Sequence, residues 1–472
     1  MKKIKLYLAI ALSAAFLSAT LALQSCQKAQ PESDNTEEAA NDSVTEDIAG
    51  VKHPEWSKNA TIYEVNIRQY TPEGTFKAFQ THLPRLKELG VDILWLMPIH
   101  PIGEKERKGK LGSYYAVKDY RGVNPEFGTM EDFKAFVTEV HKLGMKVILD
   151  WVPNHSAWDN PWITQHPDWY TQDSTGKIIH PEGTDWTDVA DFNYDNPALR
   201  KEMISALQFW VEEADIDGYR CDVAGSVPTD FWNDVRPALD EIKPVFMLAE
   251  WEATDLHERA FDMTYGWSLY EVMHKVAKGE ENASSITKHF MKEFQNYPKT
   301  AYRMYFVDNH DKNSWDGTVF EQFGDGLEAF MVLAATAQGM PLIYAGQEAG
   351  LDRRLKFFEK DEIEWKEHKF AGMYKTLMTL NHENKALWNG QYGGQMQILN
   401  TNQPKAIFAF LREQDGNRVL TILNLSKEKQ SFSIAGDLYA DEYKNVFSGE
   451  TQKVEANTQM TLEPWGYTLL AK

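Results

Sequence analysis

From about residue 56 to residue 390, short apolar runs alternate with amphipathic helical stretches. The apolar runs are rich in β-branched and aromatic residues, which is typical of buried strands. The helical stretches carry leucines three or four positions apart and end at glycine, as in segment 76–89, which stops at Gly90. An alternation of this kind predicts a parallel α/β architecture.

Eight of the apolar runs are predicted to be strands. They span residues 61–67, 91–98, 146–152, 218–223, 244–251, 260–265, 302–308 and 341–345. A further helix is predicted over 132–143. Eight strands with intervening helices, spread over roughly 330 residues, fit a closed (β/α)8 TIM barrel better than an open sheet. The barrel is expected to occupy 55–390.

Two regions depart from this alternation. After the third strand, a connection of about 45 residues precedes the helix near Pro197, and a loop that long in a compact domain is usually functional. It predicts an inserted subdomain at about 155–196. Beyond 390 the pattern changes to alternating strands with turn signals at 414–417 and 447–450. This pattern predicts a C-terminal β-sandwich over 391–472.

The first residues predict export. Three lysines precede the apolar run 6–23, and the stretch ends at Leu-Gln-Ser-Cys26, which indicates a signal peptide over 1–25. The ending resembles a bacterial lipoprotein cleavage site, which implies a lipid on Cys26; an ordinary cleaved signal peptide is the alternative. Residues 26–54 are polar and acidic, so a flexible tether is expected. The protein should be anchored to a bacterial membrane (outer membrane or cell surface), or otherwise be periplasmic or secreted.

The overall charge narrows the range of partners. The formal net charge is -21, which would repel the phosphates of nucleic acid and argues against it as a ligand. Tryptophan is frequent, with 15 residues, several of them between 151 and 186. Such a cluster suits either sugar faces or core packing.

Three acidic residues follow predicted strands. Asp222, Glu250 and Asp311 each come after an apolar run, where a carboxylate is costly to hold unless a site uses it. In a parallel barrel they would converge at the C-terminal end. Cys221 alternates with its neighbours, so its side chain should point into the packing between barrel and helices. No disulfide is expected if Cys26 carries lipid.

Four segments in order carry a family resemblance. They are the Asp-Trp-Val-Pro-Asn-His of 150–155, the Gly-Tyr-Arg-Cys-Asp of 218–222, Glu250, and the His-Asp pair 310–311. With these motifs the chain resembles the α-amylase family of retaining glycoside hydrolases over roughly 56–472. The resemblance implies a TIM barrel that acts on α-glucans.

Retaining hydrolysis needs a nucleophilic carboxylate on one side of the sugar and a proton donor on the other. Asp222 is the predicted nucleophile, because Arg220 leaves the same strand on the same face and can keep it ionised. Glu250 is the predicted general acid, with a pKa raised by burial and by neighbouring carboxylates. Asp311 is expected to orient sugar hydroxyls and help distort the ring. Arg220 is also placed among the substrate-binding residues, with Asp150 as its partner.

The resemblance implies further sugar contacts. His155 and His310 correspond to the two family histidines that hydrogen-bond the sugar at the cleavage point. Tyr115 is assigned to the tyrosine that stacks under that sugar, and Tyr114 is the competing assignment.

A metal site and one departure complete the comparison of motifs. Asn154 and Asp191 correspond to family residues that ligate calcium in some members and only tie the loop to the barrel in others; both interpretations stay open. No organic cofactor is expected. Many α-amylases follow the nucleophile with a lysine-histidine pair, whereas this chain has Gly225 and Ser226. Binding beyond the cleavage point should therefore differ.

The leading hypothesis is a hydrolase of α-1,4-glucosidic bonds in starch, maltodextrins or related α-glucans. One alternative is an α-glucan transglycosylase of the glucanotransferase or trehalose synthase-like kind. Another is a glucan-binding surface protein without turnover. The expected partner is an α-glucan or maltooligosaccharide, with a surface glucan-uptake system as a further hypothesis.

Overall fold

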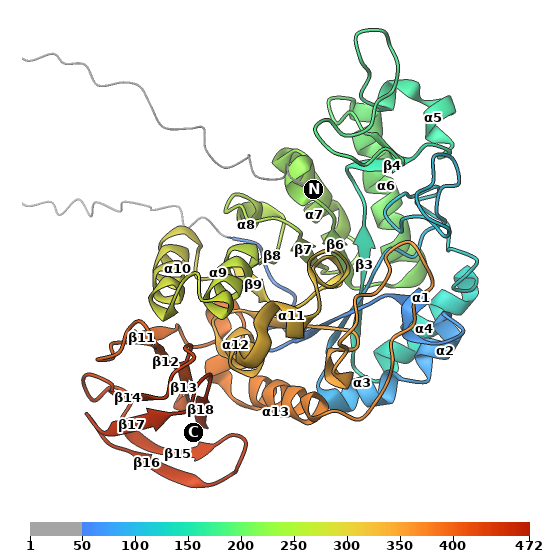
Figure 1. Ribbon diagram of the computed structural model, residues 1–472. Helices are drawn as coiled ribbons and strands as arrows, with labels where there is room; N and C mark the ends of the chain where they lie inside the picture. Colours follow the sequence, from blue (N-terminus) through green and yellow to red (C-terminus); the bar gives the residue numbers. More distant parts are fainter. Residues whose placement is uncertain (1–49) are drawn as a thin grey trace, which may run out of the picture. The chain divides into compact units, whose positions relative to one another are not determined.

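The computed structural model describes residues 50–472. Eight parallel strands close into a barrel in the order β1-β10-β9-β8-β7-β6-β3-β2 (Figure 1). The strands are β1 Ile62–Val65, β2 Ile93–Leu96, β3 Lys146–Trp151, β6 Gly218–Cys221, β7 Phe246–Ala249, β8 Met263–Tyr265, β9 Tyr302–Tyr305 and β10 Met340–Tyr344. The predicted TIM barrel is confirmed. Seven of the predicted strands contain the observed ones, and the eighth, predicted over 341–345, is offset by one residue from β10.

The barrel strands are buried on both faces, as near-continuous apolar runs require. All residues of β1, β2, β6 and β7 are buried. The ladder continues past the assigned ends of two strands, since Asp222 N donates to Trp151 O at 2.8 Å and Glu250 N to Cys221 O at 3.0 Å. Both carboxylates therefore leave the C-terminal rim of the barrel on rigid backbone.

Helices cover the outside of the barrel or cap its ends. They are α1 Ile67–Tyr70, α2 Phe76–Gln80, α3 Leu83–Leu89, α4 Met130–Lys142, α5 Trp162–Gln165, α6 Pro197–Ala214, α7 Thr229–Asp240, α8 Leu256–Arg259, α9 Trp267–Lys278, α10 Ala283–Asn296, α11 Val319–Phe323, α12 Leu327–Thr336 and α13 Lys369–Glu383. The single helix predicted over 76–89 is wrong, because the segment breaks between α2 and α3. Pro84, in the first turn of α3, has no N–H to donate to the carbonyl of Gln80.

The long connection after β3 carries its own small sheet. Strands β4 His155–Ala157 and β5 Val189–Asp191 pair antiparallel, and the segment between them includes α5 (Figure 1). The register pairs His155 with Asp191. The ribbon therefore holds both ends of the insertion together above β3.

The C-terminal region forms two antiparallel sheets. The larger has the order β11-β12-β13-β18-β15-β16, and β14 pairs with β17. The strands are β11 Gln397–Leu399, β12 Ile407–Gln414, β13 Asn417–Asn424, β14 Gln430–Ser433, β15 Asp441–Asn445, β16 Thr451–Val454, β17 Gln459–Leu462 and β18 Tyr467–Ala471. Both predicted turns connect paired strands, β12 to β13 and β15 to β16.

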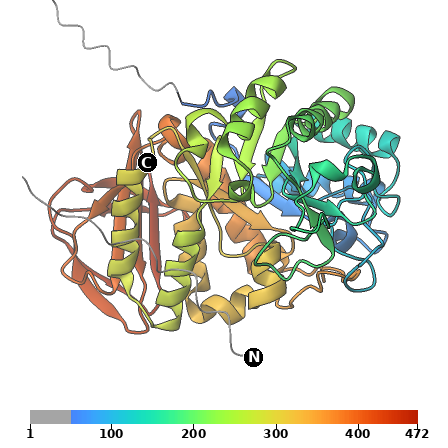
Figure 2. The ribbon, with the colours of Figure 1, turned by 90° about the horizontal axis from the view of Figure 1, so that it is seen from above.

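The C-terminal sheets pack against α12 and α10 of the barrel (Figure 2). Arg412 of β12 is fully buried and donates to the backbone oxygens of Ala337 at 2.7 Å and Trp388 at 2.9 Å. This side chain crosses from the sheet to the barrel, so the two parts are joined by hydrogen bonds as well as apolar contact.

The structure moves one predicted boundary. His53 lies within the expected tether of 26–54, yet its side chain is buried and bonds Asp262 Oδ1 at 2.7 Å and Thr300 O at 2.9 Å. It also stacks on Tyr302. The last residues of the expected tether therefore belong to the folded unit. The sequence did not reveal this, because a histidine among polar residues has the composition of a linker.

The structure describes one of the two cysteines. Cys221 is buried and free, as the alternation along its strand predicts, whereas Cys26 and the signal peptide lie outside the described residues. Among the helices within residues 50–472, none has the length and apolar character needed to cross a membrane.

Candidate active site

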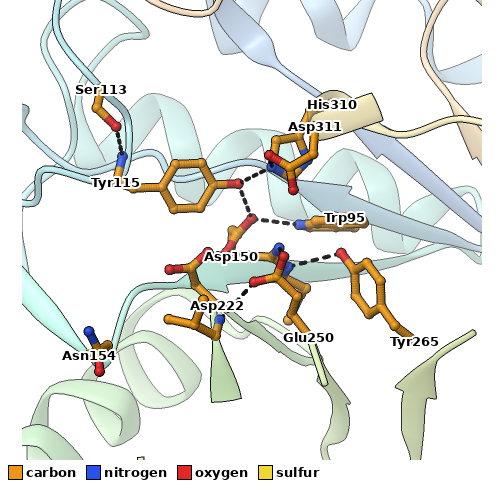
Figure 3. Close-up of polar contacts among 12 residues, drawn as sticks. Trp95, Ser113, Tyr115, Asp150, Asn154, Asp222, Glu250, Tyr265, His310 and Asp311 are labelled. Atoms are coloured by element: carbon orange, nitrogen blue, oxygen red, sulfur yellow. Dashed lines mark hydrogen bonds and ion pairs between the residues drawn. The ribbon is translucent and has the colours of Figure 1, made fainter. Parts of the chain in front are cut away.

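A pocket of about 550 Å³ opens at the C-terminal rim of the barrel. Its lining includes all three predicted catalytic carboxylates, those of Asp222, Glu250 and Asp311. They come from the ends of β6 and β7 and from the turn after β9, segments far apart in sequence. The structure thus brings the predicted acids to one site (Figure 3).

Arg220 organises the floor beneath this pocket. Its guanidinium contacts Asp150 at 2.8 Å, Asp222 at 2.9 Å and Glu250 at 3.1 Å, and its Nε donates to the hydroxyl of Tyr265 at 3.2 Å. Because two nitrogens of one planar guanidinium make the contacts at 2.9 and 3.1 Å, the contacting oxygens of Asp222 and Glu250 lie within about 8 Å of each other. That limit admits the roughly 5–5.5 Å of a retaining enzyme.

The structure places Arg220, predicted to bind substrate, outside the lining of the pocket. Its side chain is fully buried and is absent from the pocket lining. Its guanidinium holds the carboxylates of Asp222 and Glu250, which do line the pocket. Asp150 is likewise fully buried and also accepts from Trp95 Nε1 and Tyr115 Oη, each at 3.1 Å.

The surroundings of Glu250 favour its protonated form. Burial raises its pKa to about 8; Arg220 opposes this shift, and the charges of Asp222 and Asp311 add to it. A carboxyl group that keeps its proton near neutral pH can serve as a general acid. Burial also raises the pKa of Asp150, to about 7.

Val223 connects the two carboxylate-bearing strands. Its backbone N donates to Glu250 Oε2 at 2.7 Å. The residue has φ 37° and ψ 47°, a left-handed conformation that a β-branched side chain rarely adopts. Strain of this kind is typical of functional sites, where the surrounding structure maintains it.

On the opposite wall, Tyr115 and His310 form a bonded pair. The Tyr115 hydroxyl lies 2.9 Å from His310 Nε2, while His310 Nδ1 contacts the buried carboxylate of Glu64. Burial alone would lower the pKa of His310, but the charges of Asp311 and Glu64 outweigh it and raise the pKa to about 9. The histidine is therefore placed as a cationic donor next to Asp311, 3.4 Å away.

The structure distinguishes the two tyrosine assignments by position. Tyr115 lines the pocket, whereas Tyr114 is absent from the lining and packs its ring against the guanidinium of Arg68. His155 also lines the pocket, and burial lowers its pKa. A neutral imidazole there can donate or accept a hydrogen bond.

Asn154 and Asp191, the residues predicted for calcium, lie next to β4 and at the end of β5. Calcium prefers about six to eight oxygen ligands. Asn154 Nδ2 is 3.2 Å from His155 Nδ1, apart from the bonded carboxylates (Figure 3), and burial raises the pKa of Asp191. Within residues 50–472, no three acidic, histidine or cysteine side chains gather closely enough to hold a metal. The pairing of β4 with β5 ties the two ends of the loop together, and calcium at these residues stays a prediction.

Several pocket residues were not predicted individually. Among the tryptophans of 151–186, Trp186 lines the pocket, whereas Trp151 and Trp169 are buried in the core. The pocket is also lined by Lys108, by Trp315 after β9, and by Phe357 and Phe358 in the loop after β10. The unusual density of aromatic residues was the available signal, but it does not say which rings face the cavity.

Lys108 joins two of the loops around the pocket. Its Nζ donates to Asp185 O at 2.5 Å and lies 3.4 Å from Asp188 Oδ1. The neighbouring Leu111 N donates to Phe358 O at 3.1 Å. These contacts connect the insertion, the loop after β2 and the loop after β10 around one side of the cavity.

Comparison with known proteins places the chain among relatives. The domain described as "Alpha amylase, catalytic domain" matches residues 33–186 and 169–394, and "Maltogenic Amylase, C-terminal domain" matches 396–469. The chain is 26% identical to "Alpha-amylase MalA" of Haloarcula japonica, over 83% of this chain and 60% of that protein. It is 25% identical to the maltogenic α-amylase of Bacillus acidopullulyticus, over 87% and 78% of the two chains.

Solved structures agree with this placement. The maltogenic α-amylase AmyB of Thermotoga neapolitana is similar with a TM-score of 0.81 and 31% identity, covering 88% of this chain and 99% of that one. The catalytic-domain match covers more than half of the chain, and its boundary with the C-terminal match falls between α13 and β11. The chain therefore belongs to the α-amylase family of glycoside hydrolases.

Proposed function

We propose that this protein hydrolyses α-1,4-glucosidic bonds in starch, maltodextrins or related α-glucans by double displacement. The observation that carries this proposal is the convergence of three carboxylates on one pocket, with Glu250 surrounded so that it keeps its proton. One carboxylate bonded to a buried cation and another held protonated are the two groups that retention of configuration requires.

In the first step, Asp222 attacks the anomeric carbon while Glu250 donates its proton to the departing glycosidic oxygen. A covalent glycosyl ester on Asp222 results, and the leaving sugar departs with a new hydroxyl group. Arg220, 2.9 Å from Asp222, fixes the orientation of the nucleophile. Tyr115 supplies an aromatic surface for the sugar ring, and Asp311 and His310 contact its hydroxyls.

In the second step, Glu250 acts in the reverse sense. As a carboxylate it accepts a proton from water, and the oxygen of that water attacks the anomeric carbon and breaks the ester bond to Asp222. The sugar leaves with its original configuration. The strained Val223 backbone, bonded to Glu250, holds the acid at the same position for both steps.

The test follows reducing ends released from maltooligosaccharides between about pH 5 and 8, with the anomeric form of the first product observed by NMR. We expect release of the α-anomer, and loss of essentially all release in Asp222→Asn. No release at any pH in this range would contradict the proposal, and release of the β-anomer would contradict double displacement. A binding protein without turnover would bind glucan equally well with either residue at position 222.

We also propose that the protein is exported and anchored to a bacterial membrane by lipid on Cys26. The anchored protein would lie at the outer membrane or cell surface, where a glucan-uptake system would receive its products. The motivating feature is the basic and apolar N-terminal sequence. Expression of Cys26→Ser in a bacterial host, followed by membrane fractionation, tests the anchor. Retention of the variant in the membrane fraction would contradict it.

A further inference from the structure

A second hollow, of about 350 Å³, adjoins the active-site pocket beside Glu250. It shares Val223 and Glu250 with that pocket and is otherwise lined by Trp251, Glu252 and Trp267. A general acid must contact the glycosidic oxygen that departs. The hollow beside Glu250 is therefore on the side of the leaving sugar, and any group that later attacks the covalent intermediate arrives from the same side.

Trp251 forms an open aromatic face in this hollow. Its side chain is 43% exposed, although it follows a fully buried strand. A Cβ built on Gly225 would lie 2.1–2.3 Å from three atoms of the indole. The ring therefore lies directly against the backbone of Gly225, and its exposed part borders the hollow. Only glycine at 225 permits this contact without displacing the ring.

The other side chains of the hollow are engaged by protein partners. Glu252 accepts from Ser268 N at 3.0 Å and Ser268 Oγ at 2.9 Å, and it also pairs with Arg303. Trp267 stacks on Tyr265 at 5.0 Å between ring centroids. The exposed indole of Trp251 is thus the surface of this hollow that is free to contact a ligand.

We propose that Trp251, seated on Gly225, is the platform for the sugar on the leaving side, and that it makes a sugar an effective acceptor of the glycosyl group. The inference rests on the proposed double displacement. A hydroxyl of a sugar lying on the indole attacks the anomeric carbon and breaks the ester bond to Asp222. Its proton passes to the Glu250 carboxylate, and a longer oligosaccharide is released without any other reactant.

The experiment measures two quantities at low and high maltotriose concentration. One is total bond cleavage, and the other is the yield of products longer than maltotriose. In the native protein, longer products should appear at high concentration. Trp251→Ala should lower the ratio of transfer to hydrolysis at least about fivefold, whereas Trp251→Phe, which keeps an aromatic face, should retain most of it. Release of phenol from an aryl α-maltoside measures formation of the glycosyl ester separately, so that a change in the ratio of transfer to hydrolysis is distinguished from a loss of the first step.

Gly225→Ala provides an independent arm, because its methyl group would displace the indole without removing it. It should resemble Trp251→Ala. Phe447→Ala, at an exposed aromatic residue of the C-terminal sheets (39% exposed), is the matched control and should match the native protein. The platform is refuted if native protein cleaves without transfer at any concentration, or if Trp251→Ala transfers normally. A native protein that cleaves neither substrate would refute the double displacement itself.

Discussion

Replacing Arg220 with methionine removes the one charge that three active-site carboxylates share. Methionine fills a similar volume without charge, so most of the packing is kept. In the native protein the guanidinium is fully buried and contacts Asp150, Asp222 and Glu250 at 2.8, 2.9 and 3.1 Å. Breaking a buried ion pair by removing one partner costs about 3–5 kcal/mol, because the other charge stays buried without compensation. We expect the free energy of unfolding at pH 7 to fall by at least about 3 kcal/mol.

The size of this loss should depend on pH. Burial raises the pKa values of Asp150 and Glu250, and Arg220 opposes that rise, so both values increase further in Arg220→Met. A carboxyl group whose pKa is higher in the folded state holds extra protons there. Its contribution to stability is complete below the unfolded pKa near 4 and is lost as pH rises through the folded pKa. In the native protein these values are about 7 and about 8, so the deficit of the variant should grow as pH rises above about 7, by about 1.4 kcal/mol for each unit of added shift.

Urea unfolding followed by circular dichroism at pH 6, 7.5 and 9 measures this deficit on both sides of the native pKa values. The matched control is Arg236→Met, since Arg236 is also buried and bonds Asp240 at 2.7 Å and Asp262 at 2.9 Å but does not line the pocket. Both variants should lose stability, while only Arg220→Met should lose kcat, by about 100-fold or more. A loss of stability below about 1 kcal/mol in Arg220→Met, or one independent of pH, would refute the reasoning.

Three further predictions follow from the site. Since the pKa of Glu250 is raised to about 8, kcat/KM of the native protein should decline above that pH, and a profile flat to pH 10 would argue against Glu250 as the acid. Glu250→Gln should lose about 100-fold or more in kcat. Its free energy of unfolding should increase relative to that of the native protein as pH rises from about 5 to 8. Treatment with a chelator should leave the melting temperature unchanged, because within residues 50–472 no three acidic, histidine or cysteine side chains gather closely enough to hold a metal. A fall of several degrees, reversed by calcium, would show instead that an ion binds at Asn154 and Asp191. Lys108→Ala should raise KM for maltotriose about two- to fivefold, consistent with loss of a partly exposed ion pair. The control Lys118→Ala breaks surface pairs to Glu104 and Asp159 and should leave KM unchanged. Equal KM values in the two variants would show that the loop contact is dispensable.

The sequence alone determined the architecture and the acids. Local periodicity is set by which face of an element is buried, so the eight strands, the C-terminal sheets and both of their turns could be predicted from hydrophobic spacing and glycine. Asp222 and Glu250 could be found for the same reason, because strand ends in a parallel barrel meet at one rim. The glycine at 225 was visible as a departure from the family motif, although its consequence was not.

Only the tertiary structure decided how these groups work together. That Arg220 lies beneath the pocket rather than in it, that Trp186 faces the cavity while Trp151 is buried, and that Trp251 lies on Gly225 all depend on contacts between segments distant in sequence. Such contacts are set by loop conformation and by competition for buried space, which no local spacing of apolar and polar residues encodes.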